Sequence, residues 1–117
     1  MLNDKLYHYR AELLAVTDGD TIKVKVDLGM RLYRDIALRV ADINTPEIRG
    51  EERPQGLLAK QAAVEWLLGK RLVIRTEKDP GSYDRYTAVI YDADTEENFG
   101  DYMVKSGFAA PYVYKWS

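Results

Sequence analysis

The 117-residue chain contains no cysteine, which excludes disulfide bonds, thiolate nucleophiles and zinc-thiolate sites. It also lacks any apolar run long enough to span a bilayer, so no membrane anchor is expected. The first twelve residues show neither the basic start nor the apolar centre of a secretory signal. A cytoplasmic location is therefore expected, although a processed secreted protein would also lack its signal.

The chain has no excess of basic residues. Seventeen Lys and Arg residues face nineteen Asp and Glu residues, which gives a formal net charge of -2. A protein that grips duplex nucleic acid nonspecifically usually carries a broad basic surface. Any polyanion must therefore be bound by a small local cluster of cations.

The composition is that of an ordinary soluble protein, with 46% hydrophobic and 31% charged residues. Its length suits one compact domain spanning residues 1–117 and is too short for two. The single histidine, His8, lies near the amino terminus, where we expect it on the surface.

Alternation of apolar and polar residues predicts five strands. Turn residues separate the first three, at Asp18-Gly19-Asp20 and at Asp27 to Gly29. In the third strand Leu38 and Val40 share one face, and Arg39 lies on the other. The predicted strands are residues 9–16, 21–27, 31–43, 71–77 and 86–92.

Two segments change to helical spacing. Within residues 55–68, helical spacing relates Leu57, Gln61, Val64 and Leu68, with Leu58, Ala62 and Trp66 beside them, and Gly69 follows as a cap. Residues 99–106 form a second, shorter helix. The element order predicts a mainly β protein with helices (α+β), a five-stranded oligonucleotide/oligosaccharide-binding barrel with a helix after strand 3 and a short helix after strand 5.

Asp18-Gly19-Asp20-Thr21 has two interpretations. Asp-Gly is a common hairpin turn, and short motifs recur by chance. Alternatively, Asp20 presents a carboxylate to a hard divalent cation, which prefers oxygen ligands.

Arg39 needs a partner because it lies on a rather apolar strand face. One candidate is an acid, with Asp35 on the same face of the strand. The other is a phosphate, which the guanidinium fork holds by two parallel hydrogen bonds.

Glu47 directly follows Thr45-Pro46, where the proline ends the strand and fixes the direction of the next residue. A carboxylate so placed is able to orient or deprotonate a water molecule.

Arg85 lies in a glycine-bearing loop, where it forms either a surface ion pair with Asp84 or Asp79, or a phosphate contact. Two arginines, several carboxylates and a cation are the set that phosphodiester hydrolysis requires.

Four blocks of sequence together resemble the staphylococcal nuclease (thermonuclease) family. They are DGDT at 18–21, LRVADINTPE at 38–47, YDRYTAVIY at 83–91 and VKSGFAAPYVY at 104–114. The chain is similar to a short bacterial or bacteriophage member. The resemblance implies a calcium-dependent endonuclease that acts on DNA and RNA and leaves 3'-phosphate ends.

The resemblance also implies a role for each matching residue. Asp20 corresponds to a metal-binding aspartate, Thr45 to a threonine whose carbonyl binds the ion, and Asn44 to the second metal ligand. The expected catalytic residues are Arg39 and Arg85, which clamp the phosphate, and Glu47, the general base. Tyr83, Tyr112 and Tyr114 match tyrosines around the bound nucleotide, where stacking tolerates any base.

Three features depart from the family pattern. Asn44 replaces a carboxylate, which predicts weaker calcium binding or a preference for Mg²⁺ or Mn²⁺. Asp42, two residues earlier on the same predicted strand face, is a candidate substitute ligand. Asp84 stands before Arg85 where a glycine is usual, and the net charge is acidic, so substrate binding should be weak and salt-sensitive.

Two functions follow from these features. The first is a metal-dependent nuclease, monomeric and with no membrane partner, acting on DNA or RNA that is preferably single-stranded. The second is a catalytically weakened barrel that binds single-stranded nucleic acid or a protein partner.

Overall fold

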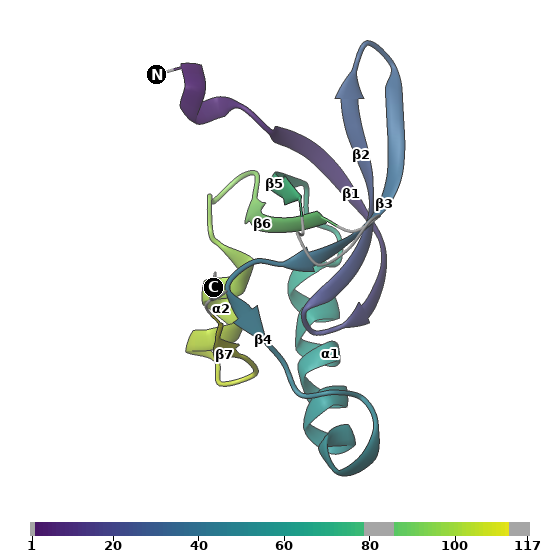
Figure 1. The fold of residues 1–117 in the computed structure, drawn as a ribbon, viewed down its shortest axis with the longest axis vertical. Helices are drawn as coiled ribbons and strands as arrows, with labels where there is room; N and C mark the ends of the chain where they lie inside the picture. The colour runs from purple at the N-terminus through teal and green to yellow at the C-terminus, as the bar shows by residue number, and fades with distance from the viewer. Residues whose placement is uncertain (1, 79–85, 113–117) are drawn as a thin grey trace.

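Five strands close into a barrel in the computed structural model, which describes residues 2–78 and 86–112 (Figure 1). Their order around the barrel is β1-β2-β3-β6-β5, with β3 and β6 parallel and the other neighbours antiparallel. The strands are β1 (His8–Asp18), β2 (Thr21–Gly29), β3 (Leu32–Val40), β5 (Leu72–Lys78) and β6 (Tyr86–Asp92). This arrangement confirms the predicted five-stranded barrel.

Helices α1 (Arg53–Leu67) and α2 (Phe99–Lys105) pack beside the barrel, α1 following strand 3 and α2 following the last barrel strand as predicted. Short 3₁₀ helices occur at Leu2–Lys5 (η1) and Gly50–Glu52 (η2). No described helix combines the length and the apolar character needed to cross a membrane.

The core fills the inside of the barrel and the space beneath the two helices. Ile22, Val24 and Val26 of β2 point inward, as their alternation predicts, and at the end of β3 Leu38 and Val40 are fully buried. Trp66 of α1 meets Phe99 of α2 with ring centroids 5.3 Å apart, so the helices share one core with the barrel.

The apolar set predicted for α1 is only partly buried: Ala62 and Trp66 face the core, but its leucines do not. Leu57, Leu58 and Leu68 are 44%, 61% and 70% exposed. The helix instead buries a set of mostly small residues: Gly56, Ala59, Ala62, Ala63, Trp66 and Leu67. Small residues let the helix axis approach its neighbours closely. This close approach determines which face of α1 is buried more than the positions of the three leucines do.

The β2–β3 hairpin is longer than predicted and projects from the barrel (Figure 1). The predicted turn at Asp27 to Gly29 is displaced, because β2 continues to Gly29 and the chain reverses through residues 29–31. Gly29, Met30 and Arg31 all have left-handed backbone angles, with φ of 82°, 53° and 63°.

A second, two-stranded sheet joins β4 (Ile43–Asn44) to β7 (Ala110–Pro111), with Asn44 opposite Ala110. The backbone amide of Tyr112 extends this connection by donating to the carbonyl of Asp42 at 2.8 Å. The small sheet was not predicted. It fixes the exit of β3 against a segment from the other end of the described chain.

Candidate functional site

Asp20 lies at the end of the tight β1–β2 turn and is 8% exposed. Its Oδ2 accepts a hydrogen bond from the backbone amide of Thr45 at 3.1 Å, and its Oδ1 accepts one from the hydroxyl of Thr21 at 3.2 Å. The carboxylate is therefore buried and fixed in place. A hairpin turn alone does not require this burial.

Gly19 explains why this turn lies so close to Thr45. A Cβ atom at Gly19 would lie 3.0 Å from both Ala59 Cβ and Thr45 Cγ2. Glycine lets the turn, α1 and Thr45 meet there without displacing these neighbours.

Arg39 reaches Asp20 because Thr21 pairs with Arg39 in the β2–β3 ladder. Its Nη1 lies 3.4 Å from Asp20 Oδ2, and the two side chains are 14% and 12% exposed. Asp35, which alternation along the strand favoured as the acid partner, lies opposite Lys25 instead. The acid beside Arg39 comes from a different strand.

The other guanidinium nitrogen of Arg39 points to the β4 segment. Nη2 donates to the Ile43 carbonyl at 3.1 Å and to Asn44 Oδ1 at 3.4 Å. The guanidinium carbon also lies 5.6 Å from the centre of the Tyr112 ring. Arg39 thus contacts Asp20, β4 and Tyr112 at once.

Two buried polar atoms in this region have no hydrogen-bond partner among the described residues. They are Nη1 of Arg39 and Oγ1 of Thr45. Buried polar groups are usually paired, because leaving one unpaired costs about 1–3 kcal/mol. Nη1 of Arg39 has the Asp20 carboxylate as an ion-pair partner but no hydrogen bond, so both atoms keep hydrogen-bonding capacity for a ligand.

Glu47 is held by its backbone. Its amide donates to Glu52 Oε2 at 3.1 Å, and its carbonyl packs against Gly56 of α1. Within residues 2–78 and 86–112, no hydrogen bond or ion pair involves the Glu47 carboxylate, which is exposed. Both its backbone direction and its side-chain freedom suit a group that acts on water.

The predicted strand relation between Asp42 and Asn44 is wrong. Asp42 has φ of 65°, so the strand is broken there and the two residues do not alternate along one extended segment. Asp42 instead uses its carbonyl to fix Tyr112. The geometry gives no support for Asp42 as a substitute ligand.

The oxygen atoms of this site suit a hard divalent cation in type but supply little charge. Asp20 offers a carboxylate, Asn44 an amide oxygen and Thr45 a backbone carbonyl, and all three are oxygen ligands of the kind that calcium binds. Within the described part of the chain, no group of three or more His, Cys, Asp or Glu side chains is placed to hold a metal. The donor set therefore fits a weakly held cation.

Three of the predicted residues, Tyr83, Arg85 and Tyr114, lie outside the described residues. The structure brings together Asp20, Arg39, Asn44 and Thr45, with Tyr112 against Arg39 and Glu47 two residues beyond Thr45. Sequence reasoning missed the Ile43 carbonyl and Gly56. Gly56 was detectable only as a glycine inside a helical segment, which often marks a close backbone approach.

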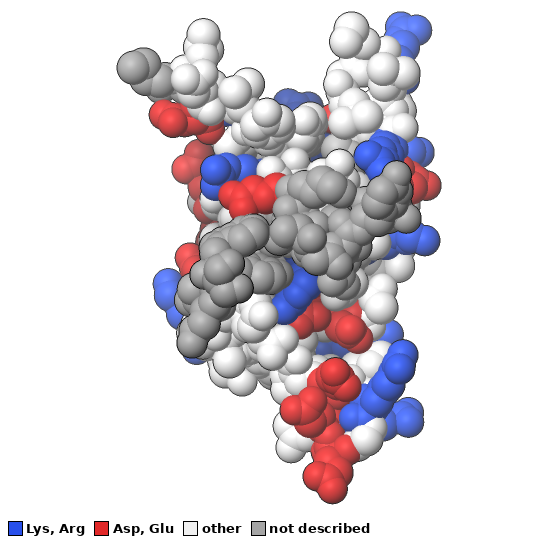
Figure 2. Space-filling view, viewed as in Figure 1, with Lys and Arg blue, Asp and Glu red and all other residues white. Residues whose placement is uncertain are grey.

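Charges of both signs are interspersed on the surface shown in Figure 2. At the lower end of that view, acidic and basic side chains cover the segment between β4 and α1 and the start of α1, which include exposed Glu47, Arg49, Glu51, Glu52 and Arg53. The described residues of this face therefore do not produce the single-sign field that attracts a long polyanion.

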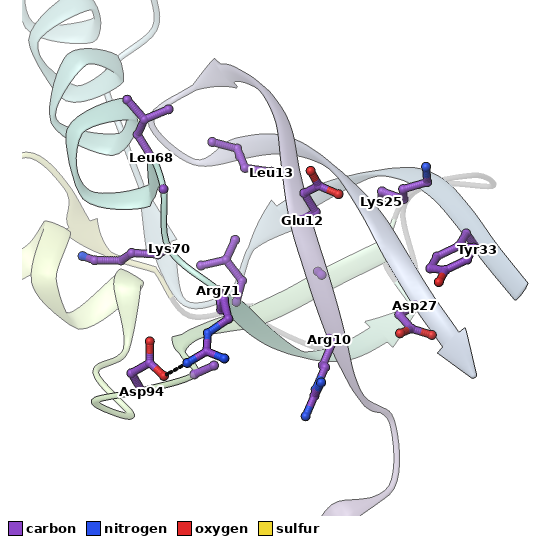
Figure 3. Close-up of a pocket in the computed structure, with 14 residues that line it drawn as sticks. Arg10, Glu12, Leu13, Lys25, Asp27, Tyr33, Leu68, Lys70, Arg71 and Asp94 are labelled. Atoms are coloured by element: carbon purple, nitrogen blue, oxygen red, sulfur yellow. Dashed lines mark hydrogen bonds and ion pairs between the residues drawn. The ribbon is translucent and has the colours of Figure 1, made fainter. Parts of the chain in front are cut away.

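A separate groove of about 660 Å³ lies between the outside of β1–β2 and the chain that leads from α1 into β5 (Figure 3). It contains none of the predicted site residues. Four basic and three acidic side chains line the groove, and Arg71 forms an ion pair with Asp94. Its charges largely balance, so it does not favour a polyanion over other ligands.

Comparison with known proteins gives two kinds of match. Residues 37–117 match the family model described as "Staphylococcal nuclease homologue". The chain is 30% identical over 113 residues to a micrococcal nuclease of Shigella flexneri and 26% identical over 130 residues to an uncharacterized protein of Methanocaldococcus jannaschii. Each match covers 91% of this chain but only 60% of the relative, so the chain spans less than two thirds of their length.

Proposed function

The chain belongs to the staphylococcal nuclease family, and we propose that it hydrolyses phosphodiester bonds of DNA or RNA with the help of a divalent cation. The observation that carries this proposal is the contact between the Arg39 guanidinium and the buried Asp20 carboxylate beside Thr45. A phosphodiester needs a cationic fork to bind its oxygens and an anionic group to hold a metal next to it. Here Nη1 of Arg39 and Oδ2 of Asp20 lie 3.4 Å apart.

Arg39 binds the scissile phosphate in this proposal. Its Nη1 has no hydrogen-bond partner among the described residues and is buried, so a phosphate oxygen would satisfy it. The Ile43 carbonyl and the Tyr112 ring orient the guanidinium before the substrate arrives. This preorganisation lowers the cost of stabilising the charge that develops on phosphorus.

Glu47 serves as the general base. It takes a proton from a water molecule whose oxygen attacks phosphorus, and the bond from phosphorus to the 5' oxygen breaks. The leaving oxygen takes a proton from solvent water, so the products carry a 3'-phosphate and a 5'-hydroxyl. Arg85 supplies a second guanidinium to the phosphate.

Asp20, Asn44 and the carbonyl of Thr45 hold the cation, for which we propose calcium, with magnesium or manganese as alternatives because Asn44 is neutral. When bound, the cation neutralises phosphate charge and polarises a phosphate oxygen. Asp20 is prepared for this role by burial and by the Thr45 and Thr21 hydrogen bonds that hold its oxygens in place.

We propose a preference for single-stranded substrates. A net charge of -2 and the mixed charges on the described part of the face in Figure 2 do not favour the broad basic surface that grips a duplex. The bases of a single strand are free to stack on aromatic rings, and Tyr83, Tyr112 and Tyr114 are proposed for that role. Binding should weaken steeply as the salt concentration rises.

A cleavage assay tests this proposal. Labelled single-stranded DNA and RNA are incubated with the protein in calcium, magnesium, manganese or chelator, and products are separated by length. We expect cleavage only with a cation, and products whose 5'-hydroxyl ends accept a label from a polynucleotide kinase. Equal rates with cation and with chelator would contradict the metal-dependent mechanism.

Matched variants assign the residues. Asp20→Asn should abolish most cleavage, whereas Asp18→Asn, at the other end of the same turn, should leave it unchanged. Glu47→Gln should lose activity, whereas Glu51→Gln should retain it. If both members of each pair behave alike, the assignment of Asp20 and Glu47 is wrong.

One observation favours a binding function as the second candidate. Asn44 carries no charge, and its side-chain oxygen already accepts from Arg39. A protein that binds single-stranded nucleic acid without cutting it would show salt-dependent binding by fluorescence anisotropy and no products with any cation. That pair of results would replace the nuclease proposal.

A further inference from the structure

Arg39 contacts the same two side-chain oxygens on which the proposed cation site depends. Nη1 lies 3.4 Å from Asp20 Oδ2, and Nη2 lies 3.4 Å from Asn44 Oδ1. A guanidinium and a metal ion are both positive, so they repel each other when they share one carboxylate. The same oxygens therefore have two competing positive partners.

We propose that Arg39 is an internal counter-ion that competes with the divalent cation for Asp20 and Asn44. Cation binding displaces the guanidinium from these two oxygens, and the displaced guanidinium then becomes available to a phosphate. This inference rests on the proposed function, since it assumes that Asp20 is a cation ligand.

The contacts that would be lost are weak. Charge-assisted N–H···O bonds are usually about 2.7–2.9 Å long. Both contacts of Arg39 with Asp20 and Asn44 measure 3.4 Å, and Nη1 lacks hydrogen-bond geometry toward any described residue. Breaking them costs less than breaking a well-formed bidentate pair.

The contacts that would remain keep Arg39 in the site. Nη2 donates to the Ile43 carbonyl at 3.1 Å, and the guanidinium lies 5.6 Å from the Tyr112 ring centre. Neither partner is a proposed cation ligand. Arg39 can therefore leave the two oxygens by a small rotation about contacts that hold it near β4.

The neutral Asn44 makes the competition stronger in this chain. Asp20 carries one negative charge, which the single positive charge of Arg39 already balances. A cation that enters without displacing Arg39 meets no net charge from the Asp20–Arg39 pair. A carboxylate at residue 44 would supply the missing charge, so Asn44→Asp should relieve the competition.

Direct cation binding tests the inference without an activity measurement. Tb³⁺ is titrated into the protein at fixed salt and pH, and its luminescence, sensitised by nearby tyrosine, reports binding; calcium is then used to displace it. We expect Arg39→Gln to bind Tb³⁺ about tenfold more tightly than the wild type, because one nearby positive charge is removed. Asn44→Asp should also bind about tenfold more tightly.

The matched control is Arg10→Gln, which removes the same charge from an exposed position on β1 and should change affinity by less than about twofold, because exposed distant charges are screened. Asp20→Asn should lose most binding. If Asp20→Asn binds Tb³⁺ like the wild type, the cation site of the proposed function is wrong, and the proposed competition by Arg39 is refuted as well. If Asp20→Asn loses binding but Arg39→Gln binds no more tightly than the wild type, the competition alone is refuted.

A measurement on the wild type covers the case in which Arg39→Gln does not fold. Arginine side-chain N–H signals are recorded by NMR, with Arg39→Lys used to assign Arg39. Calcium should shift the Arg39 signal while the Arg10 signal stays in place. An Arg39 signal that does not respond to saturating calcium would overturn the proposal.

Discussion

Gly56→Ala should destabilise the protein even though alanine is the better helix former. An added Cβ would lie 2.2 Å from the Glu47 carbonyl oxygen, 2.5 Å from its carbon and 2.9 Å from the Ile48 nitrogen. Ordinary contact begins near 3.4 Å, so α1 and the Glu47 backbone must separate by about 1 Å. The obstacle is backbone, which cannot turn aside as a flexible side chain can.

The expected magnitude is a balance of two effects. Overpacking of this kind costs about 1–3 kcal/mol, and the contact with Glu47 is severe enough to favour the upper end. Replacing glycine by alanine within a helix contributes about 1 kcal/mol in the other direction. We expect a net loss of about 2 kcal/mol in the free energy of unfolding and a fall in Tm of about 8 °C.

Thermal unfolding followed by circular dichroism measures this change, with Gln55→Ala as the control. Gln55 is exposed on the same turn of α1, so its variant reports helix propensity alone and should lie within about 0.5 kcal/mol of the wild type. A Gly56→Ala protein as stable as the wild type, or more stable, would show that Glu47 does not approach α1 as described. The same variant should also reduce cleavage, because Glu47 moves with its backbone.

Three further changes test other parts of the structure. The Asp94 backbone amide, which donates to Asp92 Oδ1 at 2.8 Å, holds the pKa of the Asp92 carboxyl below its usual value of 3.8. Asp92 therefore stabilises the fold above about pH 4 and loses this contribution as the pH falls through its lowered pKa, so acid titration should destabilise Asp92→Asn less steeply than the wild type. Arg71→Ala should change the free energy of unfolding by less than about 1 kcal/mol in denaturant titrations, because its ion pair with Asp94 is largely exposed. Asn98→Ala should cost about 1 kcal/mol in the same titrations, since the Asn98 side chain accepts from the Asp101 amide at 3.2 Å and caps α2; no loss would argue against that cap.

The parts of the fold that depend on local pattern were predictable from the sequence. Alternation placed Leu38 and Val40 in the core, and the strand predicted at 86–92 matches β6. Two-residue strands such as β4 and β7 have no period to detect, so their pairing was not predictable. The orientation of α1 depends on how closely Gly56 and Ala59 approach other segments, which a single helix does not encode.

The same distinction applies to the candidate site. Strand alternation identified Arg39 as a residue in need of a partner, but the register between β2 and β3 determines that the partner is Asp20. The left-handed backbone of Asp42 was also hidden, because aspartate is compatible with both strand and turn. The roles assigned to Asp20, Asn44, Thr45 and Glu47 stay predictions until the assays above are made.

The β4–β7 sheet determines when the site can be assembled during synthesis. Ile43 and Asn44 leave the ribosome early, but their pairing partners Ala110 and Pro111, and the Tyr112 ring against Arg39, are translated much later. A nascent polypeptide can close most of its barrel strands while Arg39 still lacks this support. Arg39 therefore gains the support of the β4–β7 pairing and of the Tyr112 ring only after translation has passed residue 112.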